Sequence, residues 1–134
     1  MMAATVGVVL AIAVGALGTM AGLERDRAYY PVVTIVVASY YALFAAMAGS
    51  AQALVLESLA GALFAAVAVA GFRRSLWLTA GALAAHGFFD LGHADLVANP
   101  GVPGWWPAFC LTFDVAAAAW LAWRLRTGRI RAAA

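Results

Sequence analysis

The chain has 134 residues, of which 66% are hydrophobic and only 10% are charged. A soluble domain has about 45–50% apolar and about 25% charged residues, so this composition excludes an ordinary soluble protein and indicates a membrane protein. The net charge is +2, and all eight basic residues are arginine. We see no basic face with interleaved aromatic residues, so we expect no nucleic-acid partner.

Five apolar segments follow one another along the chain. They cover about residues 2–23, 31–49, 52–71, 76–93 and 107–123. Each is close to the roughly 20 residues that a helix needs to cross the hydrocarbon core of a bilayer. Strands are a poor alternative because polar and apolar residues do not alternate, and the many alanines and leucines favour helix. The sequence therefore predicts an all-α fold, with residues 1–134 forming a single domain of five transmembrane helices.

The arginines predict how these helices are oriented. They follow the first, third and fifth segments, and they are Arg25, Arg27, Arg73, Arg74, Arg124, Arg126, Arg129 and Arg131. In a chain of five spans these positions share one side of the membrane, and the connections on the other side carry no arginine. Cytoplasmic loops are enriched in arginine and lysine, so we expect the C-terminus in the cytoplasm and the N-terminus outside.

The fourth segment carries two histidines and a carboxylate on one helix face. His86, Asp90 and His93 return to the same side because successive residues turn by about 100°. Ionisable groups inside a bilayer cost about 2.5–3.5 kcal/mol each on insertion scales, and they usually face a site. The spacing therefore predicts a polar site inside the membrane.

Two further carboxylates lie in neighbouring apolar segments, Glu57 in the third and Asp114 in the fifth. With the expected topology, all these groups lie in the outer half of the membrane, about 3–15 Å below its surface at a rise of about 1.5 Å per residue. We therefore expect one shared cavity that opens outward. Tyr40 and Tyr41 are either part of its lining or ordinary helix-interface residues, and Cys110 is interpreted as a small packing residue.

The connection before the fifth segment has an unusual composition. Residues 99–107 include three prolines and two glycines, which predict a compact loop of fixed shape. Trp105 and Trp106 lie near its end. The loop is either a rigid connector whose tryptophans anchor the membrane interface, or a lid whose tryptophans contact an apolar ligand.

Three kinds of function fit these residues. Imidazole and carboxylate ligands suit zinc, iron or manganese, so His86, Asp90 and His93 are candidate ligands of a divalent metal. Without a metal, a His–Asp pair and a buried carboxylic acid can move protons in an isomerase or cyclase. The third candidate is a non-enzymatic protein that binds or transports a metal or a small molecule.

The leading prediction is a membrane-embedded, metal-dependent enzyme that acts on a lipid or another apolar small molecule. It is either a hydrolase or an acid/base lipid-modifying enzyme, and whether the chain is an enzyme at all stays open at this point. Asp90, Glu57 and Asp114 are the candidate catalytic residues. The candidate partners are membrane lipid, the apolar ligand and a second copy of the chain.

Four stretches of the sequence carry a resemblance to other proteins. They are residues 24–31, 39–41, 86–93 and 99–110, and the last two include the motifs His86-Gly87-Phe88-Phe89-Asp90-Leu91-Gly92-His93 and Pro103-Gly104-Trp105-Trp106-Pro107. In these stretches the chain resembles a group of small bacterial multi-span proteins of unassigned function. The resemblance implies a multi-pass protein of the bacterial inner (plasma) membrane, and it implies no activity.

Overall fold

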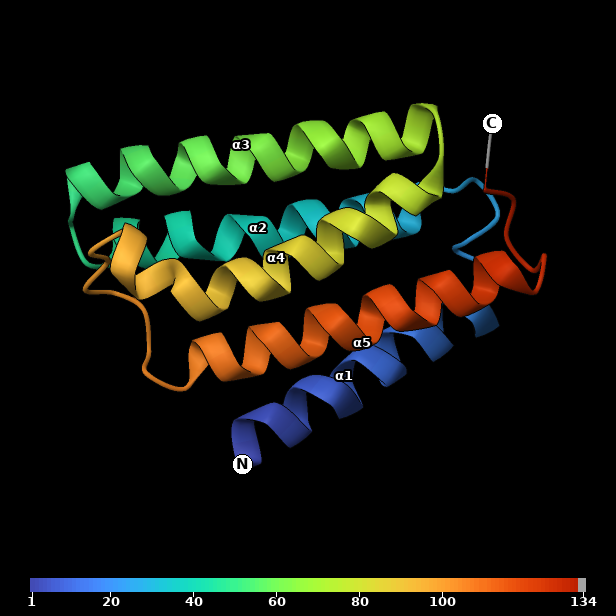
Figure 1. The fold of residues 1–134 in the computed structure, drawn as a ribbon, viewed down its shortest axis with the longest axis horizontal. Helices are drawn as coiled ribbons and strands as arrows, with labels where there is room; N and C mark the ends of the chain where they lie inside the picture. Colours follow the sequence, from blue (N-terminus) through green and yellow to red (C-terminus); the bar gives the residue numbers. More distant parts are fainter. Residues whose placement is uncertain (133–134) are drawn as a thin grey trace.

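The computed structural model describes residues 1–132 and consists of five α-helices joined by short connections (Figure 1). They are α1 (Met2–Met20), α2 (Tyr29–Met47), α3 (Ala51–Arg73), α4 (Leu76–Leu96) and α5 (Trp106–Arg126). The predicted all-α fold with five helices is therefore confirmed.

The helices run side by side, and α4 lies at the centre of the arrangement (Figure 1). It contacts α2, α3 and α5, whereas α1 packs along α5 and α3 packs along α2. A residue on the inner face of α4 can therefore meet side chains from three other helices. Because α4 is central, its two histidines can contact side chains of different neighbouring helices.

Four of the helices, α1, α2, α3 and α5, are long and apolar enough to cross a membrane. These four candidate spans suggest a membrane protein. The helix α4 is not among these candidate spans, because its ionisable residues lower its mean hydropathy. Three of these residues, His86, Asp90 and His93, are at most 3% exposed.

The helix ends differ by a few residues from the predicted segments. The first helix ends at Met20 rather than near residue 23, and the turn that follows places both Gly22 and Arg27 in the left-handed region, with φ of 71° and 67°. Ser75 begins α4 by accepting a hydrogen bond from the backbone N–H of Trp77 at 3.4 Å. This helix continues to Leu96, one turn of chain past His93.

Close packing joins α1 to α5. A side chain at Gly7 would collide with the Thr112 hydroxyl and the Phe109 carbonyl of α5. The Thr112 hydroxyl also donates a hydrogen bond to the Ala4 carbonyl at 2.9 Å. Small residues allow membrane helices to approach closely, so this contact gives α1 a fixed place in the bundle.

The arginine-bearing segments gather at one end of the bundle, on the right in Figure 1. Arg27, which follows α1, donates a hydrogen bond to the Ala132 carbonyl at 3.0 Å. The same carbonyl accepts the backbone N–H of Leu76, the first residue of α4, at 2.8 Å. The α2–α3 and α4–α5 connections lie at the opposite end (Figure 1).

Candidate metal centre

Four potential metal ligands form a buried cluster between α4 and α5. His86 and Asp90 come from α4, Cys110 and Asp114 come from α5, and one ligand atom from each lies within 4.8 Å of all the others. None of the four residues is more than 3% exposed. An imidazole, a thiol and two carboxylates in this arrangement could hold a metal ion.

The local geometry of two helices explains why these side chains meet. His86 and Asp90 are separated by one helical turn, and so are Cys110 and Asp114, so each helix presents two ligands on one face. Gly87 lets the helices approach closely, because a Cβ at this position would lie 3.1 Å from both the Asp114 Cβ and the Leu111 carbonyl oxygen. The ligands are thus supplied in pairs by two closely packed helices.

Asp114 Oδ2 is the atom that connects the cluster. It lies 2.7 Å from His86 Nδ1 in a buried hydrogen bond, and the Cys110 thiol points to it at 3.6 Å. Asp90 Oδ2 is 3.8 Å from the same imidazole nitrogen. A single imidazole nitrogen therefore faces two carboxylates.

Most carboxylate oxygens of this cluster lack a hydrogen-bond partner. Both oxygens of Asp90 and Oδ1 of Asp114 are buried without one in the described part of the chain. No arginine forms an ion pair with either carboxylate among residues 1–132. Buried polar atoms are normally hydrogen-bonded, and leaving them without a partner is costly. These oxygens are therefore candidate ligands for a cation.

The second histidine of α4 belongs to a different group. His93 Nε2 is hydrogen-bonded to Glu57 Oε1 of α3 at 2.8 Å, and the Asn99 side-chain amide donates to the same oxygen at 2.8 Å. The amide of Asn99 also donates to the Tyr41 carbonyl at 3.0 Å. The Tyr41 ring stacks on the His93 imidazole with a centroid separation of 3.8 Å. These contacts tie α2, α3, α4 and the α4–α5 connection together.

The structure thus distributes the sequence-predicted residues over two groups. His86, Asp90 and Asp114 lie together, whereas His93 and Glu57 pair with each other and are not in the four-residue cluster. Sequence reasoning missed Cys110 as a candidate ligand, although its position one turn before Asp114 was a usable signal. The cysteine also packs in the hydrophobic core, as its interpretation as a packing residue implied.

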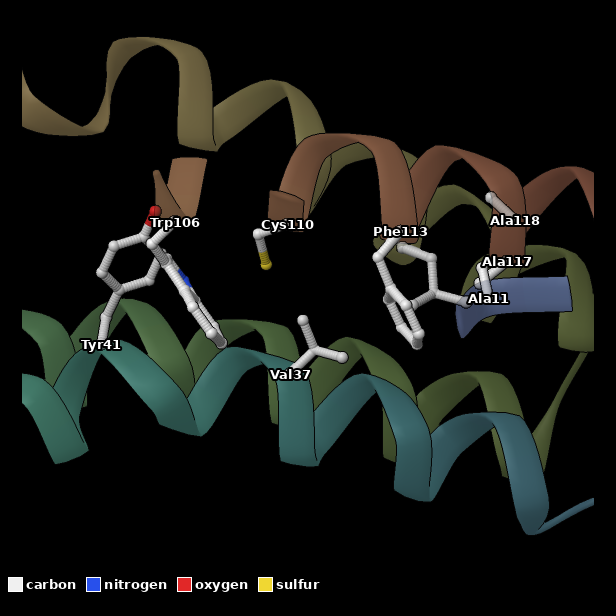
Figure 2. Close-up of a cluster of buried hydrophobic side chains, with 9 residues drawn as sticks. Ala11, Val37, Tyr41, Trp106, Cys110, Phe113, Ala117 and Ala118 are labelled. Atoms are coloured by element: carbon white, nitrogen blue, oxygen red, sulfur yellow. The ribbon is translucent and has the colours of Figure 1, made fainter. Parts of the chain in front are cut away.

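An apolar cavity of about 380 Å³ lies beside the cluster, between α1, α2 and α5. Cys110 lines this cavity and also belongs to the group of four ligands. Figure 2 shows its side chain between Trp106 and Phe113 of α5, facing Val37 of α2. The cysteine is therefore the residue at which the apolar cavity and the polar cluster meet.

The four predicted substrate-binding residues have different places. Tyr40 and Trp106 line the apolar cavity, and their rings pack with a centroid separation of 5.0 Å. Tyr41 is buried against His93 instead. Trp105 is 54% exposed and does not line the cavity. Of the two tryptophans, Trp106 alone is therefore placed to contact a molecule in the cavity.

Comparisons with protein-family profiles, with curated proteins and with solved structures give no match to this chain. The resemblance to small bacterial multi-span proteins therefore stays a prediction. Any functional conclusion depends on the geometry and chemistry of the residues themselves. These describe a helical chain with four candidate membrane spans and a buried His/Asp/Cys/Asp cluster that could bind a metal.

Proposed function

We propose that the chain crosses a membrane five times, with α4 as the span that hydropathy alone does not identify. Apart from Asp95 in the last turn, the large side chains of α4 that face outward are apolar, and Phe88, Leu91 and Leu96 are each 62–67% exposed. Its buried ionisable side chains face the other helices, where a bilayer would not contact them. The surface that α4 offers to lipid is thus as apolar as that of a typical span.

The orientation in this proposal follows from the arginines at one end of the bundle. That end faces the cytoplasm, so the N-terminus is outside and the metal centre lies nearer the outer surface. The bacterial inner membrane is the proposed location. A reporter fused after Ala134 is expected to be active in the cytoplasm, and one inserted at Asn99 only outside. The reverse pattern would contradict the orientation.

The proposed function is metal-dependent chemistry on a lipid or another apolar small molecule. The observation that carries it is the set of four candidate ligand atoms within 4.8 Å of one another, together with three buried carboxylate oxygens that have no partner among residues 1–132. One nitrogen, one sulfur and two oxygen ligands suit zinc, which is typically tetrahedral, and iron or manganese is the alternative. A bound metal of this kind polarises a carbonyl or phosphoryl oxygen or activates a water molecule.

The apolar cavity supports the choice of substrate class. Its lining is made of aliphatic and aromatic side chains, with Tyr40 and Trp106 at the end where Cys110 lies. A cavity of about 380 Å³ falls in the usual range for small-molecule sites. An acyl chain or another apolar group bound there could hold its polar end next to Cys110, the cluster residue that lines the cavity.

A metal-free acid/base enzyme is the second candidate. The buried hydrogen bond of 2.7 Å between His86 Nδ1 and Asp114 Oδ2 favours it. A histidine held by a carboxylate can accept and return a proton, as an isomerase or a cyclase requires. In that case Asp114 orients His86, and the unpartnered Asp90 is the second proton-transfer group.

Elemental analysis of the full chain, purified in detergent without a chelator, tests the metal centre. We expect about one divalent transition-metal ion per chain. The Asp90→Asn/Asp114→Asn variant should lose most of it, because two anionic ligands are removed. Asp95→Asn is the matched control, since Asp95 is an exposed carboxylate on the same helix.

The same preparations separate the candidate functions. Wild-type protein without metal would contradict the metal centre and leave the acid/base enzyme. Protein that binds metal but converts no lipid in membrane extracts, with and without added metal, would favour a binding or transport protein instead. Equal metal loss in the control and in the double variant would show that the metal is not bound by the buried cluster.

A further inference from the structure

A second cavity, of about 450 Å³, lies at the end of the bundle where the arginines gather. The end of α1 and the turn after it form one wall, and the chain at and beyond the end of α5 forms the other. Its lining includes five of the eight arginines, namely Arg25, Arg27, Arg124, Arg129 and Arg131. Within the part of the chain that the structure describes, Glu24 is the one acidic residue that lines it.

The carboxylate of Glu24 already has partners inside the protein. One oxygen forms an ion pair with an Arg124 NH2 group at 2.8 Å. The other accepts hydrogen bonds from the Tyr30 hydroxyl at 2.6 Å and the Thr19 hydroxyl at 3.3 Å. Among residues 1–132, no carboxylate pairs with the other four arginines of the cavity. The cavity is therefore strongly positive.

Two of the arginines that line this cavity have a buried nitrogen without a partner among the described residues. Arg124 is 8% exposed, and its Nε has no hydrogen-bond partner among the described residues. The Nε of Arg27 is also buried without a partner there, although its NH2 group binds the Ala132 carbonyl. A buried donor without an acceptor is unfavourable. The negative charge of an anionic ligand in the cavity would offset this excess of positive charge.

We propose that this cavity binds a phosphate group, carried either by an anionic lipid headgroup or by a soluble phosphate. Guanidinium groups match phosphate oxygens with paired, charge-assisted hydrogen bonds. Basic pockets between membrane helices on the cytoplasmic side are typical places for anionic headgroups. The site is separate from the metal centre, and the inference does not rest on the proposed metal chemistry.

Titration calorimetry on the full chain in a non-ionic detergent tests this site. The probes are dioctanoyl phosphatidylglycerol, dioctanoyl phosphatidylcholine and inorganic phosphate. We expect saturable binding of phosphatidylglycerol and none of phosphatidylcholine, whose choline group neutralises the phosphate charge. Binding of inorganic phosphate with equal affinity would identify a soluble phosphate as the source, and its absence would identify the headgroup.

The variant for this test is Arg25→Gln/Arg131→Gln, which removes two exposed arginines of the cavity and keeps the Glu24–Arg124 ion pair. Its affinity should fall at least about tenfold. Arg73→Gln/Arg126→Gln is the matched control, with the same loss of charge at exposed positions outside the cavity. No saturable binding by the wild type, or the same affinity in both variants, would overturn the proposal.

Discussion

The two histidines of α4 share a helix face but have different surroundings. His86 faces carboxylates of which three oxygens have no hydrogen-bond partner, and a thiol lies beside them. His93 is held by Glu57, and the same Glu57 oxygen also accepts the amide of Asn99. His86 also has a partner in Asp114, but its group keeps three carboxylate oxygens without one among residues 1–132, whereas the His93 group keeps only Glu57 Oε2.

This difference assigns different roles to residues that look equivalent in the sequence. In the His93 group both Glu57 Oε1 and the imidazole are paired, and Glu57 Oε2 is the one carboxylate oxygen left without a partner among residues 1–132. A buried cluster with unpartnered anionic oxygens is costly unless a cation or protons complete it. We therefore interpret the His93 group as a structural link between α3 and α4, and the His86 group as the functional centre.

Alanine substitutions at the two histidines should have the largest and most different effects. His86→Ala removes the one nitrogen ligand, so bound metal should fall to about a tenth of the wild-type level or less. His93→Ala should keep the metal because its imidazole contacts Glu57 instead. Elemental analysis of both variants measures this. Loss of metal in His93→Ala with retention in His86→Ala would reverse the comparison.

Stability should respond in the opposite order. His93→Ala removes the imidazole that is hydrogen-bonded to the buried Glu57, and the loss of one partner of a buried hydrogen bond costs about 1–3 kcal/mol of unfolding free energy. The added change Glu57→Gln removes the charge and should restore part of the loss. Unfolding in detergent followed by circular dichroism measures both variants. An unchanged unfolding midpoint in His93→Ala would show that this pair does not stabilise the fold.

The close approach of α4 and α5 at Gly87 can be tested by adding one methyl group. Gly87→Ala would place a Cβ 3.1 Å from Asp114, and such overpacking costs about 1–3 kcal/mol. It should also lower metal affinity, because His86 would move away from Asp114. Gly92→Ala is the control on the same helix, since a Cβ there meets no atom within 4 Å. Equal metal affinity in the two variants would argue against this packing role.

The smallest effect is expected at Asn99. Asn99→Ala removes the hydrogen bonds to Glu57 and to the Tyr41 carbonyl, but it leaves the His93–Glu57 pair in place. We expect a loss of about 1 kcal/mol in unfolding free energy and no loss of metal. The same unfolding and elemental measurements apply. A larger loss than in His93→Ala would mean that the loop, rather than the histidine, holds this group together.

The sequence predicted the helices well because long apolar segments leave few alternatives. The length of its apolar segment predicts α4 as a span like the others, although buried residues such as His86 and Asp90 lower its mean hydropathy. Hydropathy averages over the whole circumference of a helix, whereas lipid contacts only one side of it. Only the structure therefore shows that Phe88 and Leu91 are exposed on the side of α4 that faces away from the other helices.

The candidate site was only partly predictable. Helical periodicity places His86 and His93 on one face, but they are also about 10.5 Å apart along the axis at about 1.5 Å per residue. In the structure His93 is hydrogen-bonded to Glu57 of α3, and it is not part of the four-residue cluster around His86. Which neighbour each histidine meets depends on how α3 and α5 pack against α4. No pattern in a single amino-acid sequence predicts that packing.

The central claim is that His86, Asp90, Cys110 and Asp114 bind one metal ion together. X-ray absorption at the zinc edge, on full-length protein loaded with one equivalent of zinc, tests it most directly because the thiol distinguishes this set from the His93 group. We predict one sulfur at about 2.3 Å and a shell of nitrogen and oxygen ligands at about 2.0–2.2 Å. Cys110→Ala should lose the sulfur signal. A zinc shell without sulfur in the wild type would contradict the assignment.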